Sequence, residues 1–173
     1  FNGENSQVFG IKGILDSYYA CLNRSQLNTR DGIILYGPTH FNEIINHASM
    51  YAKSNYGNGN SYTILLLITD GVINDMEKTI KVIVDASHES PLSIVIVGVG
   101  NQNFDKMNIL DADDTPLQYD TKTGKKTASR DIVQFVPFNT YKGLDISKLA
   151  SETLKEIPDQ LVSWMISKNK MPN

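Results

Sequence analysis

Two unbroken apolar segments stand in the middle of the chain, residues 62–69 (YTILLLIT) and 92–99 (LSIVIVGV). Both are rich in β-branched residues, and neither alternates apolar with polar side chains, which is typical of parallel strands covered by helices on both faces. Between them, Met76, Ile80 and Ile83 recur at helical spacing. The pattern predicts a β-α-β unit, whose crossover is right-handed in nearly all known cases.

Helical spacing also occurs on either side of this unit. Apolar residues recur every three or four positions in segments 11–22, 41–54, 104–110 and 147–165, which are expected to be helical. Pro158 should kink the last helix or divide it in two. A third strand is expected at 132–136 (IVQFV). The order α, α, β, α, β, α, β, α predicts an open α/β layer fold.

The segments between these elements are polar. Residues 23–37 are expected to form a connecting segment with at most a short extended stretch, and residues 55–60 are expected to form a loop. Asn74 and Glu77 have the spacing of a capping pair, so the helix between the two strands should begin there. An acidic loop is expected at 111–120, followed by a basic patch at residues 122–126.

Composition narrows the classes of function. The chain has 173 residues, a usual size for a single domain, and its net charge of −3 argues against a basic surface that holds nucleic acid. The apolar runs are shorter than the roughly 20 residues that cross a bilayer. Cys21 is alone, so no intrachain disulfide can form, and a reducing cytosolic compartment fits best. The chain begins at Phe1, so it reads as a fragment, and the lack of a leader carries little weight.

The first candidate for chemistry is Asp70, because it directly follows the strand at 62–69. Ligands of open α/β sheets gather beyond the carboxyl ends of the strands, and a carboxylate there can bind a hard divalent cation. The alternative is that Asp70 starts a turn with Gly71 or caps the next helix. Thr39 is the second candidate, since a hydroxyl before a helix either caps that helix or faces a bound ion.

The cluster Asp111, Asp113 and Asp114 at first suggests a calcium loop. An EF-hand loop beginning at Asp111 needs Gly at its sixth position and Glu at its twelfth, where this chain has Pro116 and Lys122. The EF-hand is therefore rejected in favour of a solvated acidic loop.

Signals for other chemistry are weak. Gly98 and Gly100 could open a dinucleotide fingerprint, but Asn103 stands where the third glycine belongs. The three histidines fall in different segments without metal-ligand spacing, and no Ser or Cys lies in a nucleophile elbow. The residues favour a binding domain over an enzyme.

Five stretches resemble the von Willebrand factor A domain of copines, in the same order along the chain. They are LYGPTHFNEIINH, YTILLLITDGVINDMEKT, PLSIVIVGVGNQNFDKMNILDADD, SRDIVQFVPF and EIPDQLVSWM. The similarity covers nearly the whole chain. The sequences of two segments, ITDGVINDM and RDIVQFVPF, are similar to those of copines proper rather than to those of plant copine-like ubiquitin ligases.

The resemblance implies a doubly wound, mostly parallel sheet with helices on both faces, a Rossmann-like three-layer arrangement. It also implies a metal-ion-dependent adhesion site for Mg²⁺, Mn²⁺ or Ca²⁺. In that family the site combines an Asp-x-Thr-x-Ser motif on the first strand with a Thr and an Asp from later loops. Thr39 in GPTHF matches that Thr, and Asp70 in ITDG matches that Asp.

The chain departs from the family in one respect, because no Asp-x-Ser-x-Ser or Asp-x-Thr-x-Ser segment occurs in it. Residues 1–173 are therefore expected to form a single, partial A domain without its N-terminal strands and with an incomplete metal site that can be empty. In the usual order 3-2-1-4-5-6, the absent first strand lies beside the strand at 62–69. We hypothesise that the missing segment is cleaved, disordered or replaced by a partner chain, for example in a dimer through the uncovered edge.

By this resemblance the chain is a non-enzymatic protein-interaction module, whose cation coordinates an acidic residue of an intracellular partner. Copines carry two C2 domains, outside this chain, that bind phospholipid in a calcium-dependent way. The protein is thus expected in the cytoplasm, reaching membranes peripherally when calcium rises.

Two enzymatic alternatives remain open. One is the substrate-binding half of a copine-like ubiquitin ligase, which needs a RING zinc cluster that a single cysteine cannot supply within this chain. The other is a nucleotide-binding α/β enzyme that uses the Gly98–Gly100 turn.

Overall fold

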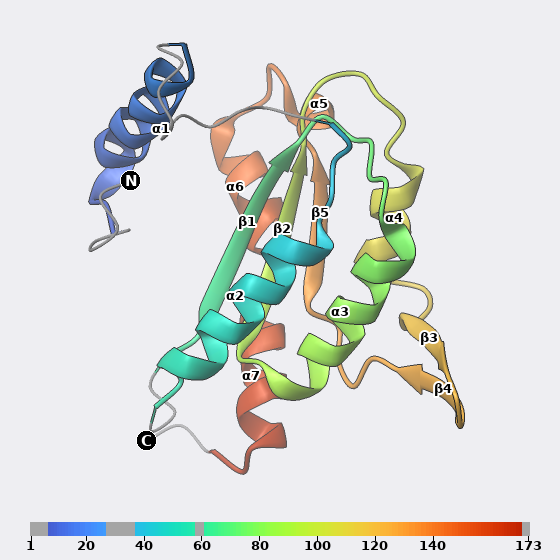
Figure 1. Cartoon of the computed structure of the whole chain (residues 1–173). Helices are drawn as coiled ribbons and strands as arrows, with labels where there is room; N and C mark the ends of the chain where they lie inside the picture. The colour runs from blue at the N-terminus through green and yellow to red at the C-terminus, as the bar shows by residue number, and fades with distance from the viewer. Residues whose placement is uncertain (1–6, 27–36, 58–60, 171–173) are drawn as a thin grey trace. The chain divides into compact units, whose positions relative to one another are not determined.

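The computed structural model describes residues 7–26, 37–57 and 61–170 (Figure 1). The chain divides into two compact units, Phe1–Gly37 and Pro38–Asn173, each taken here by itself. In the first, α1 (Gly10–Gln26) confirms the helix predicted at 11–22. Its apolar residues Ile11, Ile14 and Tyr18 are exposed. The prediction for Ile33–Leu35 lies outside the described residues.

The second unit contains the remaining helices and strands. In chain order they are α2 (Asn42–Asn55), β1 (Thr63–Thr69), α3 (Met76–Glu89), β2 (Leu92–Gly98), α4 (Asp105–Asp111), β3 (Gln118–Thr121), β4 (Gly124–Thr127), β5 (Val133–Pro137), α5 (Phe138–Tyr141), α6 (Ile146–Leu154) and α7 (Ile157–Ser167). The predicted strands and central helices are confirmed to within one or two residues. Pro158 lies in the first turn of α7 and divides the tail into two helices, as predicted.

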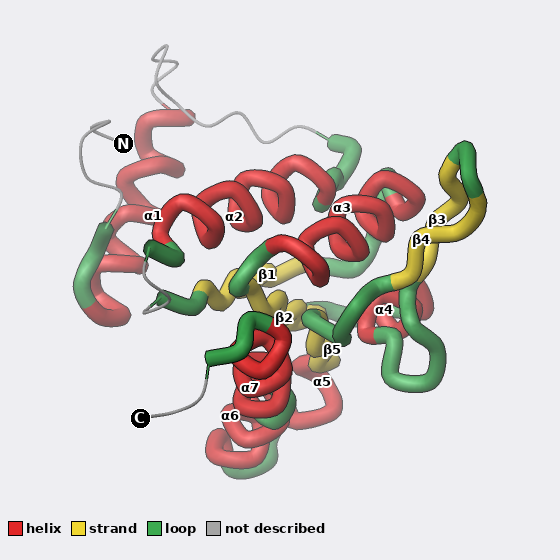
Figure 2. The backbone as a smooth tube through the Cα atoms, turned by 90° about the horizontal axis from the view of Figure 1, so that it is seen from below, coloured by secondary structure: helices red, strands yellow, loops and turns green. Residues whose placement is uncertain are grey.

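The described strands β1, β2 and β5 form one parallel sheet in that order. Thr63 pairs with Leu92, and Ile94 pairs with Val133. Helices α2 and α3 cover one face of this sheet, and α6 and α7 cover the other (Figure 2). The predicted α/β architecture, with a parallel sheet between two helical layers, is therefore confirmed.

The main core lies between the sheet and the pair α2 and α3. It combines Ile45 of α2, Ile83 of α3 and the inward side chains Ile94 and Ile96 of β2, all at most 1% exposed. On the opposite face, Trp164 of α7 is also buried and lies outside this cluster. None of the described helices has the length and apolar character that a membrane span requires.

The prediction that both central strands are buried on both faces is correct for β2 but wrong for β1. Ile64, Leu66 and Ile68 of β1 are 49%, 55% and 68% exposed. Among the described residues β1 has β2 as its only strand neighbour, so it forms an edge of the sheet. The prediction of a strand is thus confirmed, but one face of β1 is not covered by the described residues of this unit.

The other edge of the sheet, along β5, is capped by side chains. The Val133 N–H donates to Asp131 Oδ1 (3.0 Å), and the Phe135 N–H donates to Asp111 Oδ1 (2.6 Å). Gln160 Nε2 donates to the Val133 carbonyl (3.5 Å), and Pro137 has no N–H to satisfy. Side-chain capping of this kind prevents a further strand from pairing with β5.

A short antiparallel hairpin, β3 and β4, occupies part of the segment that we expected to be an acidic loop. Asp85 of α3 anchors it, because its carboxylate accepts from Tyr119 Oη (2.9 Å) and pairs with Lys126 Nζ (2.6 Å). Burial opposes ionisation of Asp85, but the bonds from Lys126, Lys81 and Tyr119 prevail and lower its pKa to about 2.

Candidate functional site

The carboxyl end of β1 brings together the two loops that hold the candidate ligands. Asp70 directly follows β1, and Thr39 lies three residues before α2. The Thr39 N–H donates to Asn74 Oδ1 (3.0 Å), and the Asn74 N–H donates back to the Thr39 carbonyl (3.0 Å). This reciprocal pair joins the Thr39 loop to the loop that begins at Asp70.

A second set of bonds, centred on Asp75, holds the same two loops together. The Asp75 carboxylate accepts from the backbone N–H groups of Phe41 (3.1 Å) and Asn42 (2.9 Å) and from the Asn42 side-chain amide. Asp75 is only 8% exposed. Burial alone would raise its pKa, but the bonds from Asn42 and Phe41 prevail and lower it. Asp75 thus satisfies the free N–H groups at the start of α2 from across the chain.

This arrangement removes the capping alternative for Thr39. The residue that caps α2 is Phe41, without a side-chain hydrogen bond, and the first N–H groups are taken by Asp75. The Thr39 hydroxyl makes no hydrogen bond within the described part of the chain, and the residue is exposed. The structure therefore leaves this hydroxyl free to bind a ligand.

The Asp70 carboxylate is free for a similar reason. The turn after β1 is made by Gly71, whose N–H donates to Thr69 Oγ1 (3.2 Å) and whose φ is +117°. Helix α3 is capped at Asp75, five residues after Asp70. Asp70 is exposed, and its carboxylate has no hydrogen-bond or ion-pair partner among the described residues. Neither the turn nor the helix needs this side chain.

A carboxylate and a hydroxyl without partners, on two joined loops, suit a hard divalent cation, which takes oxygen ligands. They supply two ligands of the six to eight that Ca²⁺ takes, or of the six that Mg²⁺ takes. Within the described ranges, no group of three or more His, Cys, Asp or Glu residues could hold a metal ion. The remaining positions of such an ion would be filled by other oxygen atoms, such as waters, carbonyls or hydroxyls.

The predicted capping role of Asn74 is wrong, because its side chain bonds Thr39 rather than the start of α3. Sequence reasoning did not identify Asn74 and Asp75 as the residues that join the loops. Their contacts with Thr39, Phe41 and Asn42 span 33 to 35 residues, so no local pattern could reveal them.

The turn considered for nucleotide binding has a packing role. A Cβ on Gly98 would lie 2.6 Å from Cε1 of Phe104, and a Cβ on Gly71 would lie 2.7 Å from the same atom. The Phe104 ring also packs against Phe135, with centroids 5.4 Å apart. The absence of a side chain at Gly98 therefore makes room for the Phe104 ring.

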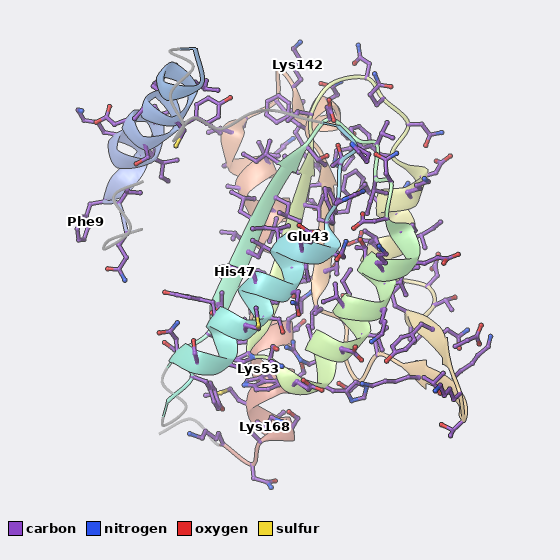
Figure 3. The ribbon with its side chains drawn as sticks, in the orientation of Figure 1. Phe9, Glu43, His47, Lys53, Lys142 and Lys168 are labelled. Carbon is purple, nitrogen blue, oxygen red and sulfur yellow. The ribbon has the colours of Figure 1, made fainter. Side chains whose placement is uncertain are left out.

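The other candidates do not join the site. Asp113 and Asp114 are exposed, as expected of a solvated loop, whereas Asp111 is half-buried at the β5 edge. The expectation of full solvation is thus wrong for Asp111, and burial raises its pKa to about 7. His47 lies on α2, one turn after Glu43 (Figure 3). His88 bonds the carbonyl of Thr127 instead of a metal.

Comparison with known proteins agrees with the sequence resemblance. The family profile described as Copine matches residues 1–173. Copine-A of Dictyostelium discoideum is 45% identical over 99% of this chain, Copine-E is 45% identical over 99%, and Copine-C is 47% identical over 96%. The chain spans 26%, 28% and 29% of the lengths of these relatives. With a parallel sheet between helical layers, as in a von Willebrand factor A-like fold, the chain belongs to the copine family.

Proposed function

We propose that this chain is the larger part of a metal-dependent protein-interaction module, in which Thr39 and Asp70 are two ligands of one divalent cation. The cation, Mg²⁺, Mn²⁺ or Ca²⁺, coordinates an acidic residue of an intracellular partner protein. The observation that carries the proposal is that both side chains are free while their loops are joined by the Thr39–Asn74 pair.

The roles of the surrounding residues follow from this geometry. Asp75 and Asn74 are positioning residues, since they fix the loops without offering free oxygens to the ion. The bound cation would supply an electrophilic centre that attracts a carboxylate. Thr39 would contribute a neutral oxygen and Asp70 a single negative charge, so these two ligands alone would leave a divalent ion with net positive charge.

The remaining ligands come, in this proposal, from a strand outside the chain that pairs with β1. The edge position of β1 supports this, because among the described strands only β2 pairs with it. Ile64, Leu66 and Ile68 lie on one face of β1 and need a helix or another surface as cover. A second copy of the chain is the rival occupant, since it could pair along the same edge. Analytical ultracentrifugation of the 173-residue chain and of a longer chain would distinguish the two occupants. If both chains are dimers, a second copy occupies the edge. If the longer chain is a monomer, an additional strand of the same chain occupies it.

For the whole protein, we propose a cytoplasmic location and peripheral membrane association when calcium rises. Phospholipid binding would be carried by C2 domains outside this chain. An enzymatic role has less support, because the Gly98 position, which could have opened a dinucleotide fingerprint, is explained by packing against Phe104. The relatives matched are named copines.

Calorimetric titration with Mg²⁺, Mn²⁺ and Ca²⁺ tests the site, using a chain long enough to include the strand before Phe1. Asp70→Ala should abolish one binding event, and Thr39→Val should weaken it while keeping the backbone bonds to Asn74. Asp114→Ala, which removes an exposed carboxylate of the acidic loop, is the matched control and should bind normally. Equal binding by the Asp70 variant and the parent would refute the assignment.

A further inference from the structure

A group of carboxyl side chains meets where α7 begins, at the end of the sheet opposite the candidate metal site. Asp131 lies just before β5, and Glu156 is the residue before α7. Both carboxyl groups lie within hydrogen-bond distance of the same donor, Gln160 Nε2, so they are neighbours. Two ionised carboxylates so placed repel each other, and a proton on one of them removes this repulsion.

Two glutamine side chains complete the contact between α7 and β5. Gln160, one turn into α7, donates through Nε2 to Glu156 Oε2 (3.2 Å) and Asp131 Oδ2 (3.4 Å). The amide nitrogen of Gln134, turned toward Glu156, donates to its Oε2 (3.0 Å). Gln160 and Gln134 are 4% and 3% exposed. The first turn of α7 is therefore attached to β5 mainly by polar bonds that converge on these two acids.

The charged groups around the pair offer it little compensation. Asp111 at the end of α4 and Asp113 in the following loop both disfavour ionisation of Glu156. Lys155, the nearest lysine along the chain, pairs with Glu152 instead (3.3 Å). Arg130 directs its guanidinium to the carbonyls of residues 90, 92 and 160. Neither Asp131 nor Glu156 forms an ion pair with any described residue.

We propose that the Asp131–Glu156 pair is a proton-dependent latch, which holds the first turn of α7 against β5 while it carries a proton and loosens when it loses it. The contact joins the residue before β5 to the first turn of α7, so its loss would free the start of α7 first. Asp131 is exposed, which gives the pair a route for proton exchange with solvent.

The pH at which the latch acts follows from its surroundings. Burial, and next the contact with Asp131, raise the pKa of Glu156 to about 8. Asp131 is exposed as a whole residue, but its carboxyl group accepts from the Val133 N–H and from Gln160, and this local burial raises its pKa. A group with a raised pKa favours the closed state at low pH and loses this effect as the pH rises through the raised pKa. The stabilisation by the latch is therefore complete below the ordinary Glu value of 4.5, is lost progressively as the pH rises to about 8, and does not change further above that pH.

Hydrogen exchange of the α7 segment, followed by mass spectrometry, tests the latch. After correction for the intrinsic pH dependence of exchange, we expect the opening constant of residues 157–162 to rise about tenfold per pH unit between pH 6 and 8. Glu156→Gln, a neutral side chain of the same shape, should abolish this rise. Glu152→Gln is the matched control and should retain it.

Two outcomes would overturn the proposal. One is a pH-independent opening constant in the parent protein, and the other is an equal rise in parent and Glu156→Gln. Exchange of α3 at pH 6 serves as the folding check for each variant. If Glu156→Gln disturbs α3, Asp131→Asn replaces it and must abolish the same pH dependence for the proposal to stand.

Discussion

Replacing Asp75 by Ala should both destabilise the domain and separate the two loops of the candidate metal site. The substitution removes one acceptor from the N–H groups of Phe41 and Asn42 and from the Asn42 side chain. The Phe41 N–H bond is buried, so this donor would lose its partner away from solvent. The loss of stability therefore has two causes: a charged acceptor is removed, and a buried N–H donor is left without a partner.

The magnitude follows from the individual bonds. Hydrogen bonds to a charged group each contribute about 1.5–3 kcal/mol, and the three bonds share one carboxylate, so their effects are not additive. We expect Asp75→Ala to lower the free energy of unfolding by about 3–5 kcal/mol. Asp75→Asn keeps one acceptor oxygen and should cost about half as much.

Urea unfolding followed by circular dichroism provides the assay. With a slope near 2 kcal/mol/M, the midpoint of Asp75→Ala should fall by roughly 1.5–2.5 M. Glu77→Gln removes an exposed charge from the same turn of α3 and controls for loss of charge at a helix start, worth about 0.3–1 kcal/mol.

The pH dependence gives an independent check of the same reasoning. The pKa of Asp75 is lowered in the folded state, so its stabilisation is present above the ordinary value of 3.8 and is lost as the pH falls through the folded value. The difference between parent and Asp75→Ala should therefore shrink in acid. A midpoint change no larger than that of Glu77→Gln would refute the role assigned to Asp75.

Three further predictions concern other parts of the fold. Arg130→Lys loses the forked donation to the Ser90 (2.8 Å) and Leu92 (3.0 Å) carbonyls and should cost about 2–4 kcal/mol in urea unfolding; a loss below about 1 kcal/mol would contradict it. Gly71→Ala should cost more than Gly100→Ala, since both have positive φ but only the Gly71 Cβ would meet Phe104; equal melting points would argue against this packing. Thermal stability should decline between pH 5 and pH 8, because burial raises the pKa of Asp111 to about 7. Asp111→Asn should lessen the decline, and an unchanged pH profile in this variant would refute the assignment.

The strands and helices that could be predicted from the sequence are those whose order of apolar and polar residues follows from burial in the core. The runs at 62–69 and 92–99 are apolar because they lie in a parallel sheet, and the position of Asp70 after a strand follows from the same pattern. The hairpin of β3 and β4 was not predicted. Its strands have four residues each and are mostly exposed, so they carry no apolar signal.

Features that depend on distant contacts could not be predicted from local patterns. Asp75 looked like one more acidic residue before a helix, yet it caps a helix that begins 33 residues earlier. Asp111 read as part of a solvated loop, but it bonds the edge of β5, 24 residues away. In both cases the sequence identified the residue type, and only the tertiary structure identified its partner.

The central claim, that Thr39 and Asp70 bind one cation, is tested most directly by paramagnetic Mn²⁺ in nuclear magnetic resonance spectra of the domain. We predict that Mn²⁺ broadens the amide signals of residues 39–41 and 70–72 first, while signals of the acidic loop at 113–115 stay sharp. Asp70→Ala should abolish this selective broadening. Broadening centred on the acidic loop, or unchanged by Asp70→Ala, would contradict the account.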